Sequence, residues 1–163
     1  MNFLVLLAAA AAGAAFVFLS SGSLPPVVAS HFGADGLANG FMDKARYVPF
    51  MAAMASGMPL LIGALMNLVR WMPASMINLP NRDYWLAPER VEETRRALGS
   101  QGTVFSLCLT AFLCSVHWLV VLANRQSPPH LADGPFTLGT VAFVVGTLGW
   151  SASFFWRFSR RAS

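Results

Sequence analysis

Long apolar stretches without charged residues alternate with short polar stretches along this chain. No Asp, Glu, Lys or Arg occurs between residues 1 and 34, and further uncharged stretches follow Tyr47, Gly99 and Gly134. Each holds about 20 mostly apolar residues, enough for a helix to cross a hydrocarbon core of ~30 Å. A backbone in lipid must satisfy its own polar groups, which favours helices. The pattern predicts four transmembrane helices, at about 3–20, 48–69, 102–123 and 137–156.

We therefore expect an all-α fold, with residues 1–163 forming one integral membrane domain, a four-helix transmembrane bundle. The first segment also has the length of a secretory signal peptide, but no Lys or Arg precedes its apolar run, which favours a retained helix. Two connections are long, an outer loop at about 21–47 and an inner loop at about 70–101.

A short interfacial helix is expected inside the inner loop. The run APERVEETRRALG places a proline where a first helical turn tolerates it and a glycine, Gly99, where a helix can stop. Glu92 and Arg96 are spaced to pair across one turn. We interpret the segment as a helix lying against the inner leaflet, with a cytoplasmic docking surface as the alternative.

Composition and charge agree with a membrane protein. The chain is 56% hydrophobic and only 11% charged, whereas soluble domains carry roughly a quarter charged residues. Basic residues set orientation in a bilayer. One side would receive eight arginines: Arg70, Arg82, Arg90, Arg95, Arg96, Arg157, Arg160 and Arg161. The other side would keep Lys44, Arg46 and Arg125. We predict a multi-pass protein of a bacterial plasma membrane with both termini cytoplasmic. The net charge of +4 then does not call for nucleic acid as a partner, because the lipid bilayer, with its anionic headgroups, attracts basic residues as well.

A polar stripe marks one face of the third predicted helix. At 100° per residue its members fall within an arc of about 80°; they are Thr103, Ser106, Thr110, Cys114 and His117. Such a stripe faces protein or water rather than lipid. We leave three roles open for His117: a histidine hydrogen-bonded to a neighbouring helix, a group that handles a ligand or proton, or half of a metal site with Cys114.

The other helices carry different features. Small residues on the fourth helix predict a close approach of helix backbones; they are Gly139, Ala142, Gly146, Gly149 and Ser153. Pro59 predicts a kink in the second helix.

The outer loop begins with LPPVVASHFGADG, residues 24–36. Proline ends the first helix, and Gly33 and Gly36 permit left-handed turns. Phe32 is suited to dip into the membrane interface. His31 is suited to bind a ligand or sense pH, or alternatively to bond a loop carbonyl.

The same loop resembles that of a bacterial family of small membrane proteins of unknown function, and the N-terminal module of the membrane immunity proteins that protect sporulating bacteria from their own secreted toxin. The matching residues are Leu24, Pro25, His31, Phe32, Gly36 and Lys44. The family's second proline is replaced by Ala29, and its usual tryptophan by Phe41. The inner-loop run NLPNRDYWLAPE, residues 78–89, is also similar, so the resemblance covers about the first hundred residues. It implies a multi-helix plasma-membrane protein, and the immunity relatives imply sensing or neutralising a peptide from outside.

These observations lead to three functional hypotheses. The first is a non-enzymatic protein that recognises an extracytoplasmic ligand, a peptide or another membrane protein. Its candidate ligand-binding residues are His31, Phe32, Asp35, Gly36, Lys44 and His117. The second is a small transporter or channel component that uses the polar stripe. The third is a metal-dependent membrane enzyme built from outer His and Asp residues, which no complete motif supports. We therefore assign no catalytic residue, no metal ligand and no cofactor.

Overall fold

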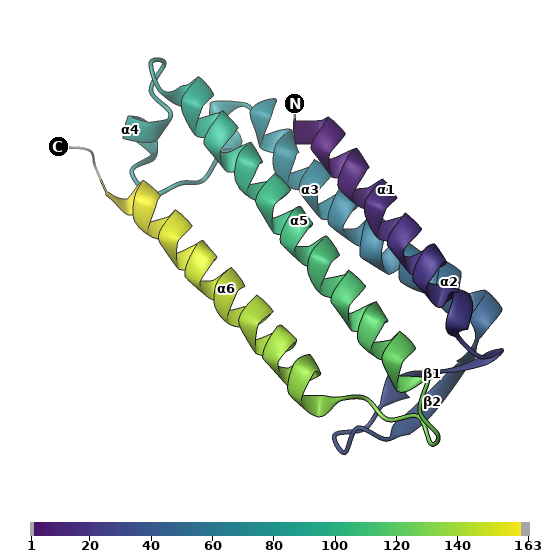
Figure 1. Cartoon of the computed structure of the whole chain (residues 1–163). Coiled ribbons are helices and arrows are strands. Elements are labelled where there is room, and N and C mark those ends of the chain that lie inside the picture. The colour runs from purple at the N-terminus through teal and green to yellow at the C-terminus, as the bar shows by residue number, and fades with distance from the viewer. Residues whose placement is uncertain (1, 161–163) are drawn as a thin grey trace.

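The computed structural model describes residues 2–160, so Arg161, counted above, lies outside the described residues. Four helical rods run side by side along one axis (Figure 1). They are α1 (Asn2–Ser20), α2 (Lys44–Ala52) with α3 (Met58–Asn67), α5 (Val91–Ala123) and α6 (Asp133–Ser159). Within residues 2–160, all four are long and apolar enough to cross a membrane.

The second rod starts earlier than the sequence predicted, and it is not a plain kinked helix. It begins at Lys44 rather than residue 48, and α2 passes into α3 through η2 (Ala53–Gly57), a π-helical turn just before Pro59. Proline has no N–H to donate one turn back and its ring crowds the carbonyl there. A wide turn at this point is the local adjustment that accommodates it.

The third rod corrects the prediction of a separate interfacial helix. The segment expected at 88–99 is instead the first part of the continuous 33-residue helix α5. Gly99 does not end it; a Cβ there would lie 2.5 Å from Arg70 Nε, so glycine is needed for close packing. Glu92 pairs with Arg95 (3.0 Å) rather than with Arg96.

The inner connection before α5 is made of short turns. It contains η3 (Leu68–Arg70), η4 (Ala74–Met76) and the four-residue helix α4 (Arg82–Trp85). Asn81, at φ 51°, donates from its side chain to the Ser159 carbonyl (2.8 Å), and Trp85 Nε1 donates to the Phe158 carbonyl (2.9 Å). These donors satisfy carbonyls at the end of α6 that have no partner within the helix.

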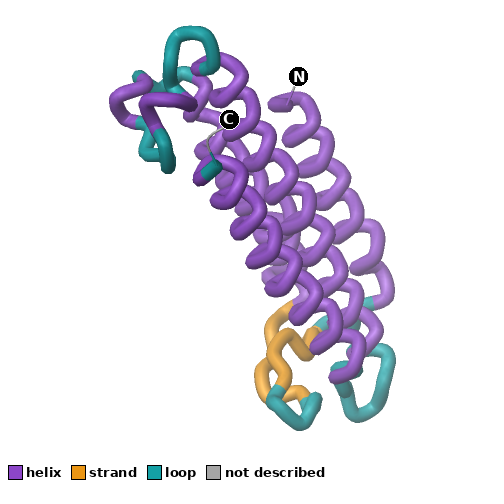
Figure 2. The backbone as a smooth tube through the Cα atoms, turned by 90° about the vertical axis from the view of Figure 1, so that its left-hand side faces the viewer, coloured by secondary structure: helices purple, strands orange, loops and turns teal. Residues whose placement is uncertain are grey.

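The outer connection corrects the all-α prediction. After a 3₁₀ turn, η1 (Ser21–Ser23), the strands β1 (Val27–Phe32) and β2 (Ala38–Asp43) pair antiparallel, with Val28 opposite Met42. Figure 2 shows this hairpin capping one end of the rods. We call this the hairpin end of the bundle and the opposite one, which holds η3 to α4, the arginine-rich end.

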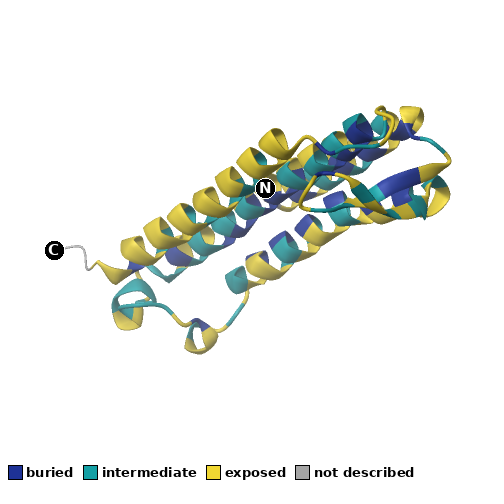
Figure 3. Ribbon diagram, turned by 90° about the horizontal axis from the view of Figure 1, so that it is seen from below, coloured by how far each residue is buried: buried dark blue, intermediate teal, exposed yellow. Residues whose placement is uncertain are grey.

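The core lies between α1, α2, α5 and the hairpin, and α6 lies outside it. Val17, Val28, Tyr47, Ala55 and Val121 belong to one buried cluster. In Figure 3 buried residues gather between the helices, whereas α6 is largely exposed; of its described residues, Phe158 alone is buried.

The small-residue face of α6 forms no close approach to another helix within the described part of this chain. A Cβ added at Gly139, Gly146 or Gly149 would meet nothing within 4 Å. Aromatic rings connect α6 to α5 instead, such as Phe112 and Phe143, whose centroids are 4.4 Å apart. Rings on the facing sides fill the space that small residues would otherwise close.

Candidate functional site

His117 lies fully buried near the hairpin end, where three helical segments meet. Its Nδ1 is 3.0 Å from the Tyr47 hydroxyl of α2, and its Nε2 is 3.0 Å from Ser20 Oγ and 3.4 Å from Ser21 Oγ. The Tyr47 ring stacks on the imidazole at 5.8 Å. Of the roles left open for His117, this geometry matches the hydrogen-bonded one.

The neighbours of His117 determine where its proton lies. The Ser20 hydroxyl donates to the Phe16 carbonyl and the Ser21 hydroxyl to the Val17 carbonyl, each at 2.6 Å. Each hydroxyl has a single proton, so both serines can only accept from His117. The proton is therefore on Nε2, and Nδ1 accepts from Tyr47. A neutral imidazole in this tautomer leaves neither ring nitrogen without a partner.

Two further members of the polar stripe on α5 are also bonded to a neighbouring helix. Ser106 Oγ donates to the Pro59 carbonyl (2.6 Å), and Thr103 Oγ1 accepts from Asn67 (3.3 Å). These members of the stripe therefore join α5 to its neighbour, as polar residues within membranes commonly do by hydrogen bonds between helices.

Two side chains, Lys44 of α2 and Asn124 at the end of α5, fasten the hairpin to the bundle. Lys44 Nζ donates to the carbonyls of Gly22 (3.1 Å) and Leu24 (2.9 Å). Asn124, at the end of α5, accepts from the Ala29 N–H (2.8 Å) and donates to the Ala29 carbonyl (2.9 Å). A side-chain amide thus occupies the position of a third strand at that edge. Lys44, a predicted ligand-binding residue, is engaged in holding the fold.

The turn between the strands rests on the loop between α5 and α6. Gly36 has φ +75°, and a Cβ there would lie 2.8 Å from both Asp133 Oδ1 and the His130 ring. Only glycine takes this backbone conformation freely. Asp35 Oδ1 accepts from the Leu37 N–H at 3.1 Å. Gly36 and Asp35 thus shape the turn and its docking.

An open cleft of about 450 Å³ lies beneath the hairpin. Its walls are residues 30–34 of the hairpin, Val116 and Val120 of α5, and Asp133, Phe136 and Thr137 of α6. The volume falls within the ~300–1,000 Å³ usual for small-molecule sites. We call it the hairpin cleft. It combines apolar side chains of two helices with polar groups from the hairpin and the start of α6.

Two predicted residues, His31 and Phe32, line this cleft. His31 is exposed and its Nδ1 donates to Asn39 Oδ1 at 2.5 Å. Phe32 is half-buried and packs against the core cluster, and the exposed aromatic of the hairpin is Phe41, at 59%. His117 does not line the cleft.

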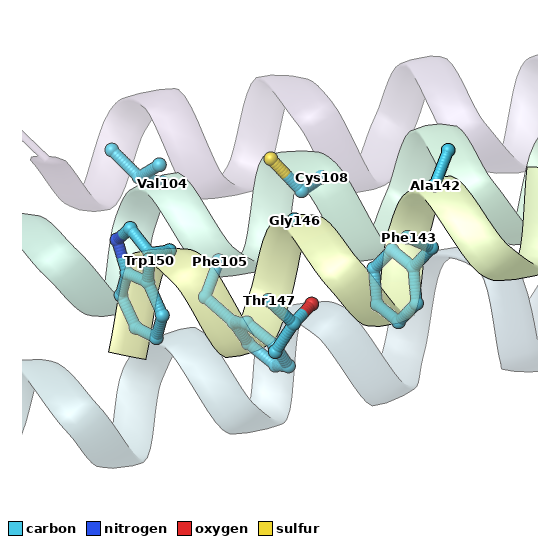
Figure 4. Close-up of a pocket in the computed structure, with 8 residues that line it drawn as sticks. All are labelled: Val104, Phe105, Cys108, Ala142, Phe143, Gly146, Thr147 and Trp150. Atoms are coloured by element: carbon cyan, nitrogen blue, oxygen red, sulfur yellow. The ribbon is translucent and has the colours of Figure 1, made fainter. Parts of the chain in front are cut away.

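A second, smaller cavity of about 200 Å³ lies midway between α5 and α6. Figure 4 shows Phe105, Cys108, Phe143 and Trp150 around it, with Gly146 between them. Its lining is almost wholly apolar, so it offers no chemistry beyond packing against hydrocarbon.

The outer histidines and acids do not assemble a metal centre in the described part of the chain. Within residues 2–160, no three His, Cys, Asp or Glu side chains are grouped so that they could hold a metal ion. The two cysteines, Cys108 and Cys114, are both free.

Comparisons with known proteins leave the family open. No family model, no curated protein and no solved structure matches the chain. The resemblance in the loops therefore stays a prediction, and the function must be argued from the geometry.

Sequence reasoning found part of the hairpin cleft. It singled out His31 and Phe32, but gave no binding role to Val116, Val120 or Thr137. These three carry no signal of their own, because the cleft exists only through the placement of the hairpin over α5 and α6. Tyr47 was missed as the partner of His117; a tyrosine within an apolar helix needs a partner for its hydroxyl, which was the available signal.

Proposed function

We propose that this is a non-enzymatic, multi-pass membrane protein that recognises an extracytoplasmic ligand in the hairpin cleft. In this proposal the hairpin end faces outside a bacterial plasma membrane, and the arginine-rich end and both termini face the cytoplasm. The four apolar helices and the distribution of basic residues support it.

The observation that carries the proposal is the cleft itself. It is open, of ligand size, and lined by an exposed histidine that the core does not need. Lys44 and Asn124 fasten the hairpin that forms its roof, and a pre-formed site loses less entropy on binding than a mobile loop would.

We favour binding over transport because the polar face of α5 is occupied. Thr103, Ser106 and His117 hydrogen-bond to neighbouring helices. The transport alternative predicts that His117→Leu abolishes solute flux in protein that still inserts, whereas the binding proposal predicts that the cleft variants below matter instead.

The test fills or alters the cleft and scores the phenotype of a deletion strain. Thr137 is exposed and lines the cleft, so Thr137→Trp should block it without disturbing the core. His31→Ala should remove the imidazole. Both variants should fail to complement the deletion.

Matched controls separate blockage from general damage. Leu138→Trp places the same ring one residue further along α6, at a 71% exposed position outside the cleft. Phe41→Ala removes the exposed aromatic from the same hairpin. Both controls should complement fully. Complementation by both cleft variants, at normal membrane levels, would leave the hairpin with a structural role alone.

A further inference from the structure

The hairpin cleft has an uneven distribution of charge. Asp133 is the only Asp, Glu, Lys or Arg among its described lining residues. Within residues 2–160, the Asp133 carboxylate has no hydrogen-bond or ion-pair partner. It therefore brings a negative charge to the cleft, which the N-terminus of α6 offsets only in part and no described cation neutralises.

No described Lys or Arg lines the cleft: of the basic residues at the hairpin end, Arg46 lies outside it, and Lys44 and Arg125 are engaged elsewhere. Lys44 is bonded to two carbonyls. Arg125 places its guanidinium 5.5 Å from the Trp118 ring centroid and donates to Ser23 Oγ at 3.4 Å. An anionic ligand would consequently meet a carboxylate without a cation beside it, and a cationic group is the favoured occupant of this position.

Apolar surface lies close to that charge. Phe136 and Thr137 follow Asp133 by one turn of α6, about 4.5 Å and about 6 Å along a helix axis that rises 1.5 Å per residue. Val116 and Val120 of α5 also face the cleft. An occupant must therefore carry a cationic group and an apolar portion a few ångströms apart.

The position of the cleft makes it accessible to lipid molecules of a surrounding bilayer. It is formed where α5 and α6 reach the hairpin end, and α6 exposes nearly all its described side chains. In a bilayer the cleft would lie at the boundary between headgroups and hydrocarbon, open to the neighbouring lipids along α6.

We propose that the hairpin cleft binds an amine-bearing phospholipid of the phosphatidylethanolamine type, a proposal that rests on the cleft being the site of the proposed function. The primary ammonium donates to the Asp133 carboxylate, and the upper acyl chain contacts Val116 and Phe136. A primary ammonium has three protons to donate. A choline headgroup has none, and a glycerol headgroup leaves the lipid anionic.

The test measures which lipid the full-length protein retains. The protein in mild detergent is mixed with equal amounts of phosphatidylethanolamine, phosphatidylcholine and phosphatidylglycerol, and retained lipids are counted by native mass spectrometry. We expect about five-fold preference for phosphatidylethanolamine, the scale of a partly exposed ion pair. Asp133→Asn should abolish the preference, and Thr137→Trp should lower retention of this lipid.

Controls and contrary outcomes are distinct for the two proposals. Asp43→Asn, at the other end of the hairpin, and Leu138→Trp should keep the preference. Equal retention of the three lipids, or a preference that survives Asp133→Asn, overturns the lipid assignment. If the lipid test fails while Thr137→Trp still fails to complement, the cleft binds another ligand. A lysine-bearing amphipathic peptide that displaces the lipid and binds more tightly would assign the cleft to peptides. If Thr137→Trp is silent in both tests, both proposals fall.

Discussion

At the residue scale, the burial of His117 is made tolerable by the direction of each hydrogen bond around it. Ser20 and Ser21 donate hydrogen bonds to helix carbonyls, and Tyr47 donates one to the imidazole. A buried polar group is costly only when it lacks such a partner. The arrangement links α1, α2 and α5 just below the hairpin.

We predict that Tyr47→Phe destabilises the protein by about 0.6–1.7 kcal/mol, between the average and the largest value measured for hydrogen bonds between membrane helices. The ring and its stacking on His117 remain, while Nδ1 loses its donor. Thermal unfolding in detergent measures the change. Tyr84→Phe is the control, because its ring lies 4.0 Å beneath the Arg90 guanidinium and keeps that contact. Equal stability of the two variants would refute the assigned proton positions.

Some of the residues that match the family signature have a structural role in the fold, and others do not. Leu24 is buried, Gly36 has a positive φ against a neighbouring loop, and Lys44 binds two carbonyls. Their chemistry could be predicted from residue type: an apolar residue, a turn glycine and a long donor. His31 is different, since its ring is exposed and bonded to Asn39 alone. The role of His31 depends on the hairpin cleft, and the sequence alone does not show that this cleft exists.

At the scale of elements, the apolar rods were predictable and the hairpin was not. Charge-free stretches of about 20 residues locate helices well in a membrane. The second strand reads ANGFMD, in which Asn, Gly and Asp are poor strand formers. Its pairing with β1 is stabilised by contacts with the bundle, and these depend on the fold. Gly99 led to the wrong prediction of a helix end. A glycine that packs against a neighbour and a glycine that ends a helix look alike in a sequence.

Asn124 should control the attachment of the hairpin to the bundle. Asn124→Leu removes both hydrogen bonds to Ala29, while Asn124→Asp keeps the acceptor for the Ala29 N–H. At about 1 kcal/mol for one bond, we expect amide exchange at Ala29 to speed up roughly five-fold in Asn124→Leu. In Asn124→Asp the second carboxylate oxygen faces the carbonyls of Ala29 and Val120 in place of the amide N–H, so exchange should speed up there as well. Hydrogen-exchange mass spectrometry of the β1 peptide measures this.

The exposed neighbour Gln126 supplies the control for that experiment. Gln126→Leu adds the same apolar side chain two residues further on, and exchange at Ala29 should stay as in the wild type. Unchanged exchange in Asn124→Leu would show that the two strands hold each other without help from α5.

At the scale of the whole molecule, the orientation in the membrane is open to a direct test. In a background with Cys108→Ala and Cys114→Ala, Asn39→Cys marks the hairpin end and Ser75→Cys marks the arginine-rich end. Both positions are exposed. A membrane-impermeant maleimide should label position 39 on intact cells, and position 75 only after permeabilisation. Labelling of position 75 on intact cells would invert the topology and place the cleft in the cytoplasm.

The length of α5 has a mechanical consequence for the molecule. Its 33 residues make a rod of about 50 Å, longer than a ~30 Å hydrocarbon core, so part of it would stand clear of a bilayer that it crossed. At one end, Asn124 binds the hairpin. At the other end, Thr94 donates to the Trp85 carbonyl (2.8 Å) and Arg95 donates to the Met72 carbonyl (2.7 Å), both in the opposite connection. A stiff lever pivoting by 5° about one extremity carries the other through about 4 Å. Because Asn124 ties the hairpin to α5, a small tilt of this rod about its arginine-rich extremity therefore moves the roof of the cleft by the same distance.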